Sequence, residues 1–455
     1  MKKSIIFTLL LSLTTIGSLE ARTYSQAEVD EMAKKISKLE QAFKDYKQEV
    51  SSEIDNLYDR ADQNEFEATT NRIKWGGKFE ADVNNYKGKT YGTSYSNSNK
   101  WTTKLKLSMS SKINEKTKFS GKLAMYKNWA DSTPSPMGTD DTTGKKSNSG
   151  TSTLFVERAY IDYQPVDSLT ITVGRQPSSD GPGMSLKNDT PRKATYPALL
   201  FDGAADGVVV TKSIKHRSIV KNIKVRAAYG KGFQKDDSMN GFLAHDNNVK
   251  DLVVSGAFAE WSFNSKKMGD NLVVLSYVKA KDFVGSPLNV EAPNNVNLGD
   301  IDLYGVHFEN NKAFGTNLNY FVSYGHSKGK PNGKTVNYGP MTGFHDVGLI
   351  DDSAHAIFAG VRYDFKKVKI GYEYNKGSKN WFSFTNGTED PMNKLATRGK
   401  ANDFYLIYNI DKNQKLRFGY TKIDYDYSGS GWHIGTPMKS TDTAKRAYVT
   451  YSVIF

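Results

Sequence analysis

The chain has 455 residues and no cysteine, and its 62 lysines and arginines against 49 acidic residues give a formal net charge of +13. The absence of cysteine excludes disulfides, thiolate metal sites and a cysteine nucleophile. The mean hydropathy of −0.59 excludes a membrane protein built from apolar helices. A membrane β-barrel stays possible because its interior is polar, and 26 tyrosines and 23 phenylalanines could supply its interfacial aromatic residues.

Residues 1–21 have the pattern of a secretory signal peptide. Lys2 and Lys3 precede an apolar run from Ile5 to Ile16, and a cleavage site is expected after Ala21. The run is too short to be a membrane-spanning helix. The sequence therefore predicts export from the cytoplasm.

Residues 25–66 are predicted to form one long helix with a coiled-coil pattern. Ser25 and Glu28 have the spacing of a capping box at its start. Apolar residues then recur in steps of three and four and define a seam: Val29, Met32, Ile36, Leu39, Phe43, Tyr46, Val50, Ile54 and Leu57. We expect a periplasmic neck that self-associates, most simply as a homotrimer. A helix that folds back on its own barrel is the alternative.

From residue 70 the apolar residues alternate with polar ones, which predicts antiparallel β-strands. The predicted strands are 73–83, 101–113, 119–129, 154–163, 169–176, 206–214, 223–230, 252–263, 272–279, 301–308, 318–326, 354–365, 368–374, 403–410, 416–425 and 446–455. Their connections alternate between short and long, as in an up-and-down membrane barrel. The predicted fold is therefore all-β, a 16-stranded antiparallel transmembrane β-barrel at residues 70–455, preceded by the coiled-coil helix. A soluble β-domain is the alternative.

A barrel of this size leaves an aqueous channel, so the polar face of its strands decides what passes. Lysine dominates that face in the first three strands, where the predicted lumen residues are Lys74, Lys78, Lys104, Lys106, Lys118 and Lys122. Cations in a pore favour the passage of anions. The alternative is that lysines near the rims contact only lipid headgroups or lipopolysaccharide.

The predicted fifth strand leads into a distinctive connection. Gly174-Arg175-Gln-Pro is followed by Gly181-Pro-Gly, where a sharp bend is expected. This segment resembles the general and phosphate-selective porins, in which the third outer loop folds into the pore opposite wall arginines. The resemblance implies that Arg175 is a wall cation at the constriction, and that Asp180, Lys187, Asp189, Arg192 and Lys193 lie on or near the loop. Strict alternation would instead place Arg175 on the lipid side unless the strand contains a bulge.

The strand before it also resembles porin strands and offers Arg158 and Asp162 as further lumen residues. In the last predicted strand, residues 447–455 alternate strictly, with Val449, Tyr451, Val453 and Phe455 on one face. A phenylalanine after such a strand resembles the C-terminal signal of bacterial outer-membrane barrels. The resemblance implies recognition by the barrel-assembly machinery.

The signal peptide, the neck, the Glu157-Arg-Ala-Tyr160 strand, the segment after Gly174 and Phe455 together resemble an uncharacterised porin-like family of Gram-negative bacteria with a domain of unknown function. This resemblance implies an integral outer-membrane protein in contact with membrane lipid and lipopolysaccharide. It implies no particular solute.

The main functional prediction is passive diffusion of small hydrophilic solutes with a preference for anions. One alternative is a channel specific for sugars or aromatic solutes, and another is a structural tether or adhesin whose coiled coil contacts the cell wall. The seven histidines are scattered and form no hydrolase or metalloprotease motif. No enzymatic activity, metal, cofactor or nucleic-acid partner is therefore expected.

Overall fold

The computed structural model describes residues 25–70, 72–129, 154–177, 180–203, 205–215, 220–235, 249–265, 269–285, 295–337, 346–385 and 390–455. The predicted signal peptide at residues 1–21 lies outside this part of the chain. Two compact units are present, residues 1–72 and residues 73–455.

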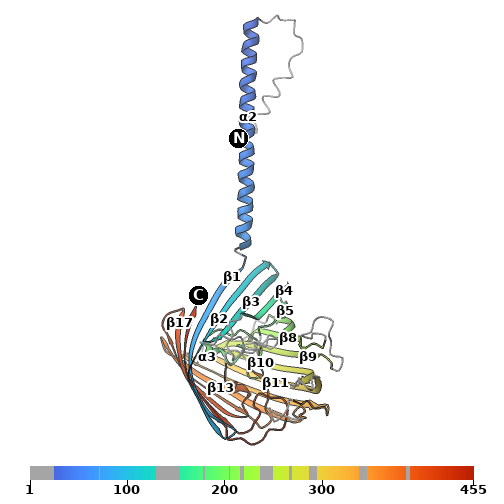
Figure 1. Cartoon of the computed structure of the whole chain (residues 1–455), viewed down its shortest axis with the longest axis vertical. Helices are drawn as coiled ribbons and strands as arrows, with labels where there is room; N and C mark the ends of the chain where they lie inside the picture. The colour runs from blue at the N-terminus through green and yellow to red at the C-terminus, as the bar shows by residue number, and fades with distance from the viewer. Residues whose placement is uncertain are drawn as a thin grey trace. The chain divides into compact units, whose positions relative to one another are not determined.

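The first unit contains helix α2 (Gln26–Thr70), which extends four residues beyond the predicted end at residue 66 (Figure 1). The capping box is confirmed: the Ser25 backbone amide donates to the Glu28 carboxylate at 2.9 Å, and the Glu28 amide donates to the Ser25 hydroxyl at 3.4 Å. The predicted seam is exposed in the single chain, with Phe43 71% and Leu57 62% exposed. Among the described helices, none is both long and apolar enough to cross a membrane.

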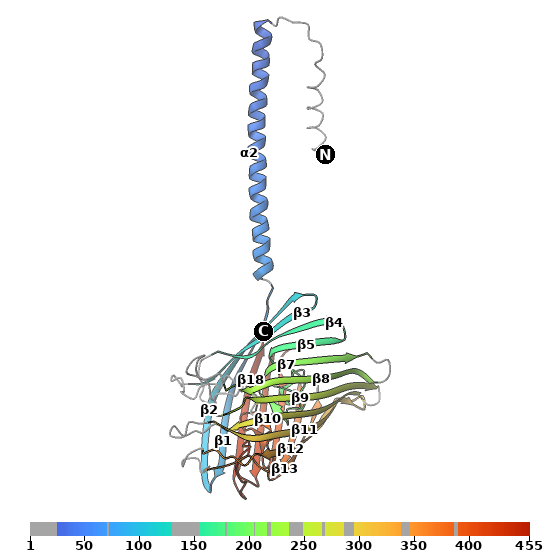
Figure 2. The ribbon, with the colours of Figure 1, turned by 90° about the vertical axis from the view of Figure 1, so that its right-hand side faces the viewer.

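The second unit is a closed, antiparallel barrel of 16 strands, which confirms the predicted fold (Figures 1 and 2). Each strand pairs with its neighbours in the order of the chain, and the first strand closes on the last. The barrel strands are β1 (Lys74–Thr90), β2 (Thr93–Asn114), β3 (Thr117–Asn128), β4 (Phe155–Val166), β5 (Leu169–Arg175), β7 (Asp206–Ile214), β8 (Val220–Phe233), β9 (Leu252–Ser265), β10 (Gly269–Gly285), β11 (Val296–Ala313), β12 (Leu318–Pro331), β13 (Ser353–Asp364), β14 (Val368–Gly377), β16 (Gly399–Asn409), β17 (Gln414–Tyr425) and β18 (Thr443–Ile454).

Strands β1 and β2 are longer than predicted. They extend through residues 84–100 and meet at Tyr91 and Gly92, whose φ angles of 49° and 80° suit a two-residue hairpin turn. The sequence pattern missed this extension because its residues are polar on both faces. Alternation of apolar and polar residues marks only the part of a strand that has one apolar face.

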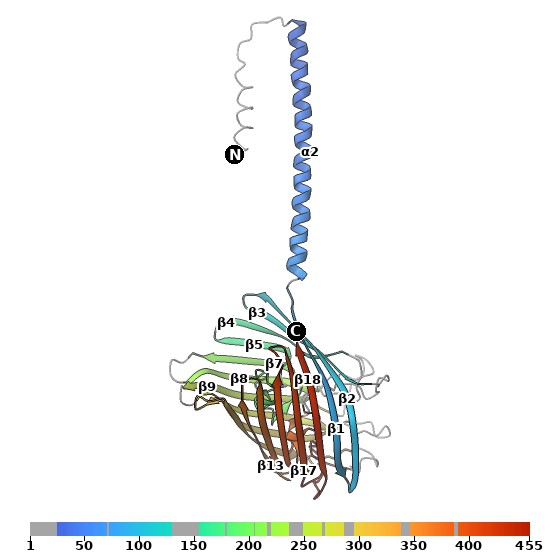
Figure 3. The same cartoon turned by 90° about the vertical axis from the view of Figure 1, so that its left-hand side faces the viewer.

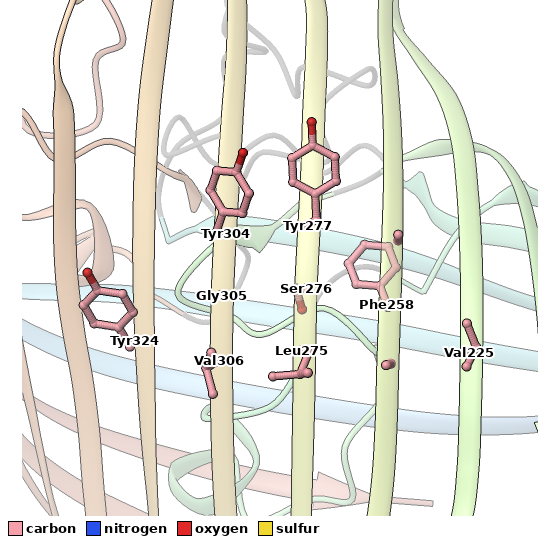
Figure 4. A pocket seen from close by; sticks show the side chains of 11 residues that line it. Val225, Phe258, Leu275, Ser276, Tyr277, Tyr304, Gly305, Val306 and Tyr324 are labelled. Atoms are coloured by element: carbon pink, nitrogen blue, oxygen red, sulfur yellow. The ribbon is translucent and has the colours of Figure 1, made fainter.

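The outward face of the barrel is apolar. On strands β8–β12 it forms a shallow groove of about 440 Å³, lined by residues that include Leu275, Tyr277, Tyr304 and Val306 (Figure 4). The hydroxyls of Tyr277 and Tyr304 point the same way along their strands (Figure 4), and the Tyr277 hydroxyl donates to Asp302 at 3.0 Å. Such an apolar surface is what contact with lipid chains requires.

Part of the inward face of β10–β13 is apolar as well, and two connecting segments fold onto it. Residues 180–203 carry the short helix α3 (Ser185–Asn188) and β6 (Phe201–Asp202), and residues 378–398 carry β15 (Phe384–Thr385) and the 3₁₀ turn η2 (Lys394–Ala396). β6 and β15 pair in parallel and join the two segments. The resulting buried cluster includes Met184, Leu199, Leu200, Phe321, Phe358, Trp381 and Phe382.

Phe455 lies against β1 at the closing seam of the barrel. Its amide donates to the Gly77 carbonyl at 3.0 Å, and the Gly77 amide donates to the Phe455 carbonyl at 2.6 Å. A Cβ atom at Gly77 would lie 2.2 Å from the Phe455 ring, so a larger residue there would require the ring to move. Val449, Tyr451 and Val453 lie half-buried on one face of β18. The use of this end in membrane insertion stays a prediction.

Candidate functional site

The inward face of β1 and β2 carries a row of buried charges. Lys78 pairs with Glu80 at 2.9 Å, and Lys104 lies 3.4 Å from Asp82. Strand β18 completes this network because the Ser452 hydroxyl donates to Glu80 at 2.9 Å. The lysines that alternation placed on this face are therefore present there, but Glu80 and Asp82 pair with Lys78 and Lys104. Lys74 begins β1 and is exposed.

A second charged group surrounds Glu157 on β4. This carboxylate lies 2.6 Å from Lys122, 3.4 Å from Lys106 and 3.5 Å from Arg158. The register between β3 and β4 shifts at Lys122, which lets the consecutive residues Glu157 and Arg158 both reach this group. The group holds three cations and one acid.

Nearer the short turns, the inner wall is less crowded. Asp162 accepts a hydrogen bond from the Thr172 hydroxyl at 2.6 Å, and its partner across β3 and β4 is the exposed residue Lys118. Both predicted lumen residues therefore share one face of the wall. This end of the wall is where solvent reaches the lysines.

Helix α3 fixes the first inward segment to the wall through a buried ion cluster. Lys187 pairs with Asp403 of β16, and Lys394 of η2 bridges Asp403 and Glu373 at 2.5 Å each. Burial lowers the pKa of Lys187 to about 8, although Asp403 opposes the shift. Burial would also lower the pKa of Lys394, but the charges of Asp403 and Glu373 raise it well above 10.5. The cluster joins both inward segments to the same wall.

Asp189, directly after α3, is the second anchor. Its carboxylate accepts from Lys369 at 2.5 Å and from Arg362 at 3.1 Å, and Lys415 lies 3.9 Å away. Burial alone would raise the pKa of Asp189, but the hydrogen bond from Lys369 and the neighbouring cations lower it below 3.8. The backbone of Asp189 has a φ of 50°, which ends the helix at this point.

Three residues after Asp189, the segment is tied to another part of the barrel wall. Arg192 donates to Glu260 of β9 at 2.8 Å, and Arg226 of β8 lies 3.1 Å from the same carboxylate. Within the segment, Lys193 lies 3.4 Å from Asp180. All five predicted loop residues therefore lie on the inward segment, and residues 187–192 of the segment contact both β13–β17 and β9.

Arg175 is a correction to the expected placement. Its register places it on the face of β5 that also carries Ile171 and Val173, which is the outward face. It forms a two-fold hydrogen bond with Asp206, at 3.0 Å from each of two guanidinium nitrogens, and donates to the Val156 carbonyl at 3.0 Å. No bulge interrupts the pairing of β5 with β7, so alternation holds up to Arg175.

A cavity of about 560 Å³ lies against the inner wall of β2–β8. Five cations and two acids line it: Lys112, Lys116, Lys118, Lys224, Arg226, Glu115 and Asp162. Threonine and serine hydroxyls and the rings of Tyr160 and Tyr196 complete the lining. Burial raises the pKa of Tyr196 to about 12, so its hydroxyl stays protonated near neutral pH.

Two parts of this site were missed by sequence reasoning. Lys224 and Arg226 alternate inward on β8, so extending the analysis of polar faces beyond the third strand would have found them. The second inward segment was read as an ordinary loop, although Trp381, Phe382 and Phe384 are an unusual apolar group in a polar connection. Among the described residues, no group of histidine, aspartate and glutamate could hold a metal ion.

Residues 94–454 match the model of a family described as a protein of unknown function, DUF3373. The chain belongs to this family. The match covers most of the barrel, and it confirms the expected relationship to an uncharacterised porin-like family. The DUF3373 description assigns no solute and no activity.

Among solved structures, the chain is similar to Salmonella typhi OmpF in complex with daunomycin, with 14% identity, a TM-score of 0.47, and coverage of 84% of this chain and 97% of that chain. It is also similar to the trimer form of OmpT, an outer-membrane protein of Vibrio cholerae, with 13% identity, a TM-score of 0.43, and coverage of 84% and 99%. No curated protein matches the chain.

Proposed function

We propose that the protein is an exported outer-membrane channel for passive diffusion of small hydrophilic solutes, with a preference for anions. The observation that carries the proposal is the polar cavity of about 560 Å³ inside a closed barrel with an apolar outward face. The proposal includes a homotrimer whose helical necks associate in the periplasm. The long connections then lie on the cell surface.

The path for solutes is expected to be off-centre. The inward segments and their apolar cluster cover the inner face of β10–β13, so the open route follows the charged wall of β2–β8. The cations around the cavity outnumber the acids there. Their field is focused by the low-dielectric wall of a narrow channel and raises the local concentration of anions.

The test is ion selectivity in a planar bilayer under a KCl gradient. The parent channel should show a reversal potential toward that of chloride. The variants Lys118→Glu and Lys224→Glu should shift it toward that of potassium, because each replaces a cation that lines the cavity. Lys212→Glu is the matched control, because Lys212 lies between Thr211 and Ser213 of the cavity lining but alternates to the outward face of β7.

Equal shifts for Lys212→Glu and Lys118→Glu would reject the assignment of this cavity to the conduction path. A parent channel that conducts without preferring chloride would reject the anion preference but would still support the channel function. The absence of conductance in correctly folded protein would reject the channel itself. The tether or adhesin would then be the favoured function.

A sugar-specific channel is the second candidate, favoured by the composition of the cavity. Tyr160 and Tyr196 offer flat rings, and Thr170, Thr172 and Thr211 offer hydroxyls that could bind a polyhydroxylated solute. Current through such a channel should be blocked in a saturable way by one sugar, and Tyr160→Ala should weaken that block. A diffusion pore would show the same small effect for every sugar of similar size.

A serine, a histidine and a glutamate lie together on β11 and β12, but we do not propose catalysis there. The Ser323 hydroxyl lies 2.7 Å from His307 Nδ1, and Glu309 lies 3.5 Å from Nε2. The histidine is 0% exposed and the serine 1% exposed, so no substrate could reach the hydroxyl. The arrangement is part of the packed inner wall.

A further inference from the structure

A row of lysines crosses the outward surface of five adjacent strands. The lysine row consists of Lys376 on β14, Lys400 on β16, Lys422 on β17, Lys445 on β18 and Lys87 on β1. Each alternates away from the buried inner residues of its strand. Figure 3 faces the part of this wall where β17, β18, β1 and β2 lie side by side.

The register brings like charges directly opposite one another at three places in the row, whereas between β16 and β17 it places Lys400 opposite Asp424. Lys376 pairs with Lys400 across β14 and β16. Lys445 is flanked by Lys422 on one side and Lys87 on the other. Paired positions in antiparallel strands have Cβ atoms about 5 Å apart, and like charges there repel. The row therefore costs stability unless anions lie against it.

The protein itself supplies few of those anions. Asp424 pairs with Lys422 at 2.9 Å. Among the described residues, no acid lies within ion-pair distance of Lys87, Lys376, Lys400 or Lys445, and all four are exposed. Five lysines thus share one acid. The exposed positive charge is therefore available to bind an anionic partner from outside the protein.

The outward lysines of β10–β12 are arranged differently. Lys279 pairs with Asp300 at 3.0 Å, and Lys330 pairs with Asp302 at 2.5 Å. Lys281 and Lys328 are exposed, and their register partners are Val253, Asp302 and Ser353 rather than lysines. Lysines therefore lie opposite one another on the wall from β14 to β1 and not on β10–β12, which places the expected anion site on the first of these walls.

The position of the row along the strands indicates the partner. Lys376, Lys400, Lys422 and Lys445 lie near the ends of their strands that lead to long connections, and Lys87 lies near the two-residue turn between β1 and β2. Tyr374, Phe404 and Tyr420 follow toward the middle of the wall on the same outward face. Aromatic residues on a membrane protein lie at the level of the headgroups, and lysines beyond them reach the charged surface. The anions that meet such a surface are lipid phosphates.

We propose that the lysine row binds the phosphate groups of a phosphorylated membrane lipid, with its acyl chains on the apolar wall below. The proposal fits a lipid with several phosphates, such as lipopolysaccharide, because neighbouring lysines are spaced along a line. It concerns the outer surface of the barrel and does not depend on conduction through its interior.

The test uses the full-length protein in detergent and native mass spectrometry with bisphosphorylated lipid A as the probe. The triple variant Lys376→Gln/Lys400→Gln/Lys445→Gln should bind this lipid at least about tenfold more weakly than the parent. The control is Lys366→Gln/Lys367→Gln/Lys412→Gln, which removes the same number of exposed lysines from the short turns β13–β14 and β16–β17. It should bind as the parent does.

Two further arms separate the sources of the phosphate. Dephosphorylated lipid A should lose most of the binding, and inorganic phosphate at the same concentration should not displace the lipid. Equal binding of both forms of lipid A, or equal loss in both triple variants, would overturn the proposal. If the first triple variant does not fold, Lys400→Glu against Lys367→Glu makes the same comparison with one charge, and equal affinities would again overturn it.

Discussion

Asp189 illustrates how much one residue can organise in the barrel interior. Its carboxylate is shared by Arg362, Lys369 and Lys415, which come from three different strands. Removing its carboxylate would leave Lys369 and Lys415 near one another without this counter-charge, while Arg362 would keep its pair with Asp364 at 2.6 Å. The residue therefore holds the inward segment in place and also neutralises the wall beside it.

The variant Asp189→Asn should be less stable at pH 7, by about 2 kcal/mol. Because the folded pKa of Asp189 is lowered below 3.8, its contribution is complete above that value and is lost as the pH falls below it. Denaturant unfolding followed by tryptophan fluorescence at pH 7 and pH 3 should therefore show a smaller difference between variant and parent at pH 3. Asp167→Asn, in the exposed β4–β5 turn, is the control. A difference that does not depend on pH would contradict the role of the charge.

Glycine at position 325 makes room for the inward segments. A Cβ atom there would lie 2.7 Å from the Trp381 ring and 3.1 Å from Leu200. Gly325→Ala should therefore destabilise the barrel by about 1–3 kcal/mol, measured by denaturant unfolding, because the ring must move in a packed cluster. Gly76→Ala is the control, since its Cβ atom would meet only the Phe455 carbonyl oxygen at 3.8 Å. Equal stabilities would show that the inward segment adapts without cost.

At the scale of elements, the two inward segments act as one unit. The Phe384 amide donates to the Leu200 carbonyl at 3.0 Å, and the Trp381 indole donates to the Leu395 carbonyl at 2.8 Å. The first bond joins the segments, and the second closes the later one on itself. A change in either segment is therefore expected to move the other, because the Phe384–Leu200 hydrogen bond and a common apolar cluster join them.

Helix α2 presents the opposite situation, an apolar seam whose side chains are largely exposed in the part of the chain that the structure describes. Replacing Ile36 and Phe43 with lysine should abolish association of the necks, because charges at seam positions cannot be buried between helices. Crosslinking in detergent should then show fewer oligomers than in the parent. The control Lys34→Glu/Lys44→Glu changes residues outside the seam. Unchanged oligomers in the seam variant would favour the tether, or a neck that does not associate.

The sequence predicted the number and order of the strands because alternation is a local property that each strand carries by itself. It could not predict features that depend on distant residues. The apolar part of the inward face of β10–β13 is covered by Leu200 and Trp381, and Glu157 joins Arg158 inside because of a register shift. The neutralisation of Lys104 by Asp82 also depends on pairing between strands.

At the scale of the whole molecule, the proposed route for solutes follows one charged wall. Its selectivity should therefore depend on ionic strength, because the Debye length falls from about 10 Å at 0.1 M to about 3 Å at 1 M salt. The permeability ratio of chloride to potassium should approach one as KCl is raised across this range. A ratio that stays constant would indicate selection by direct contact with the ion and would contradict a long-range field.

The pairing of β1 with β18 has a consequence for the kinetics of folding. Lys78 and Ile454 are register partners although most of the chain separates them, so this contact has among the longest sequence separations in the barrel. Contacts between distant residues form slowly, because the chain between them must first be ordered. Until they form, the edges of β1 and β18 stay open to other chains, and the apolar outward face has no lipid around it. If the chain is exported as proposed, we expect chaperones to bind it before the barrel closes, because a slow final closure leaves time for aggregation.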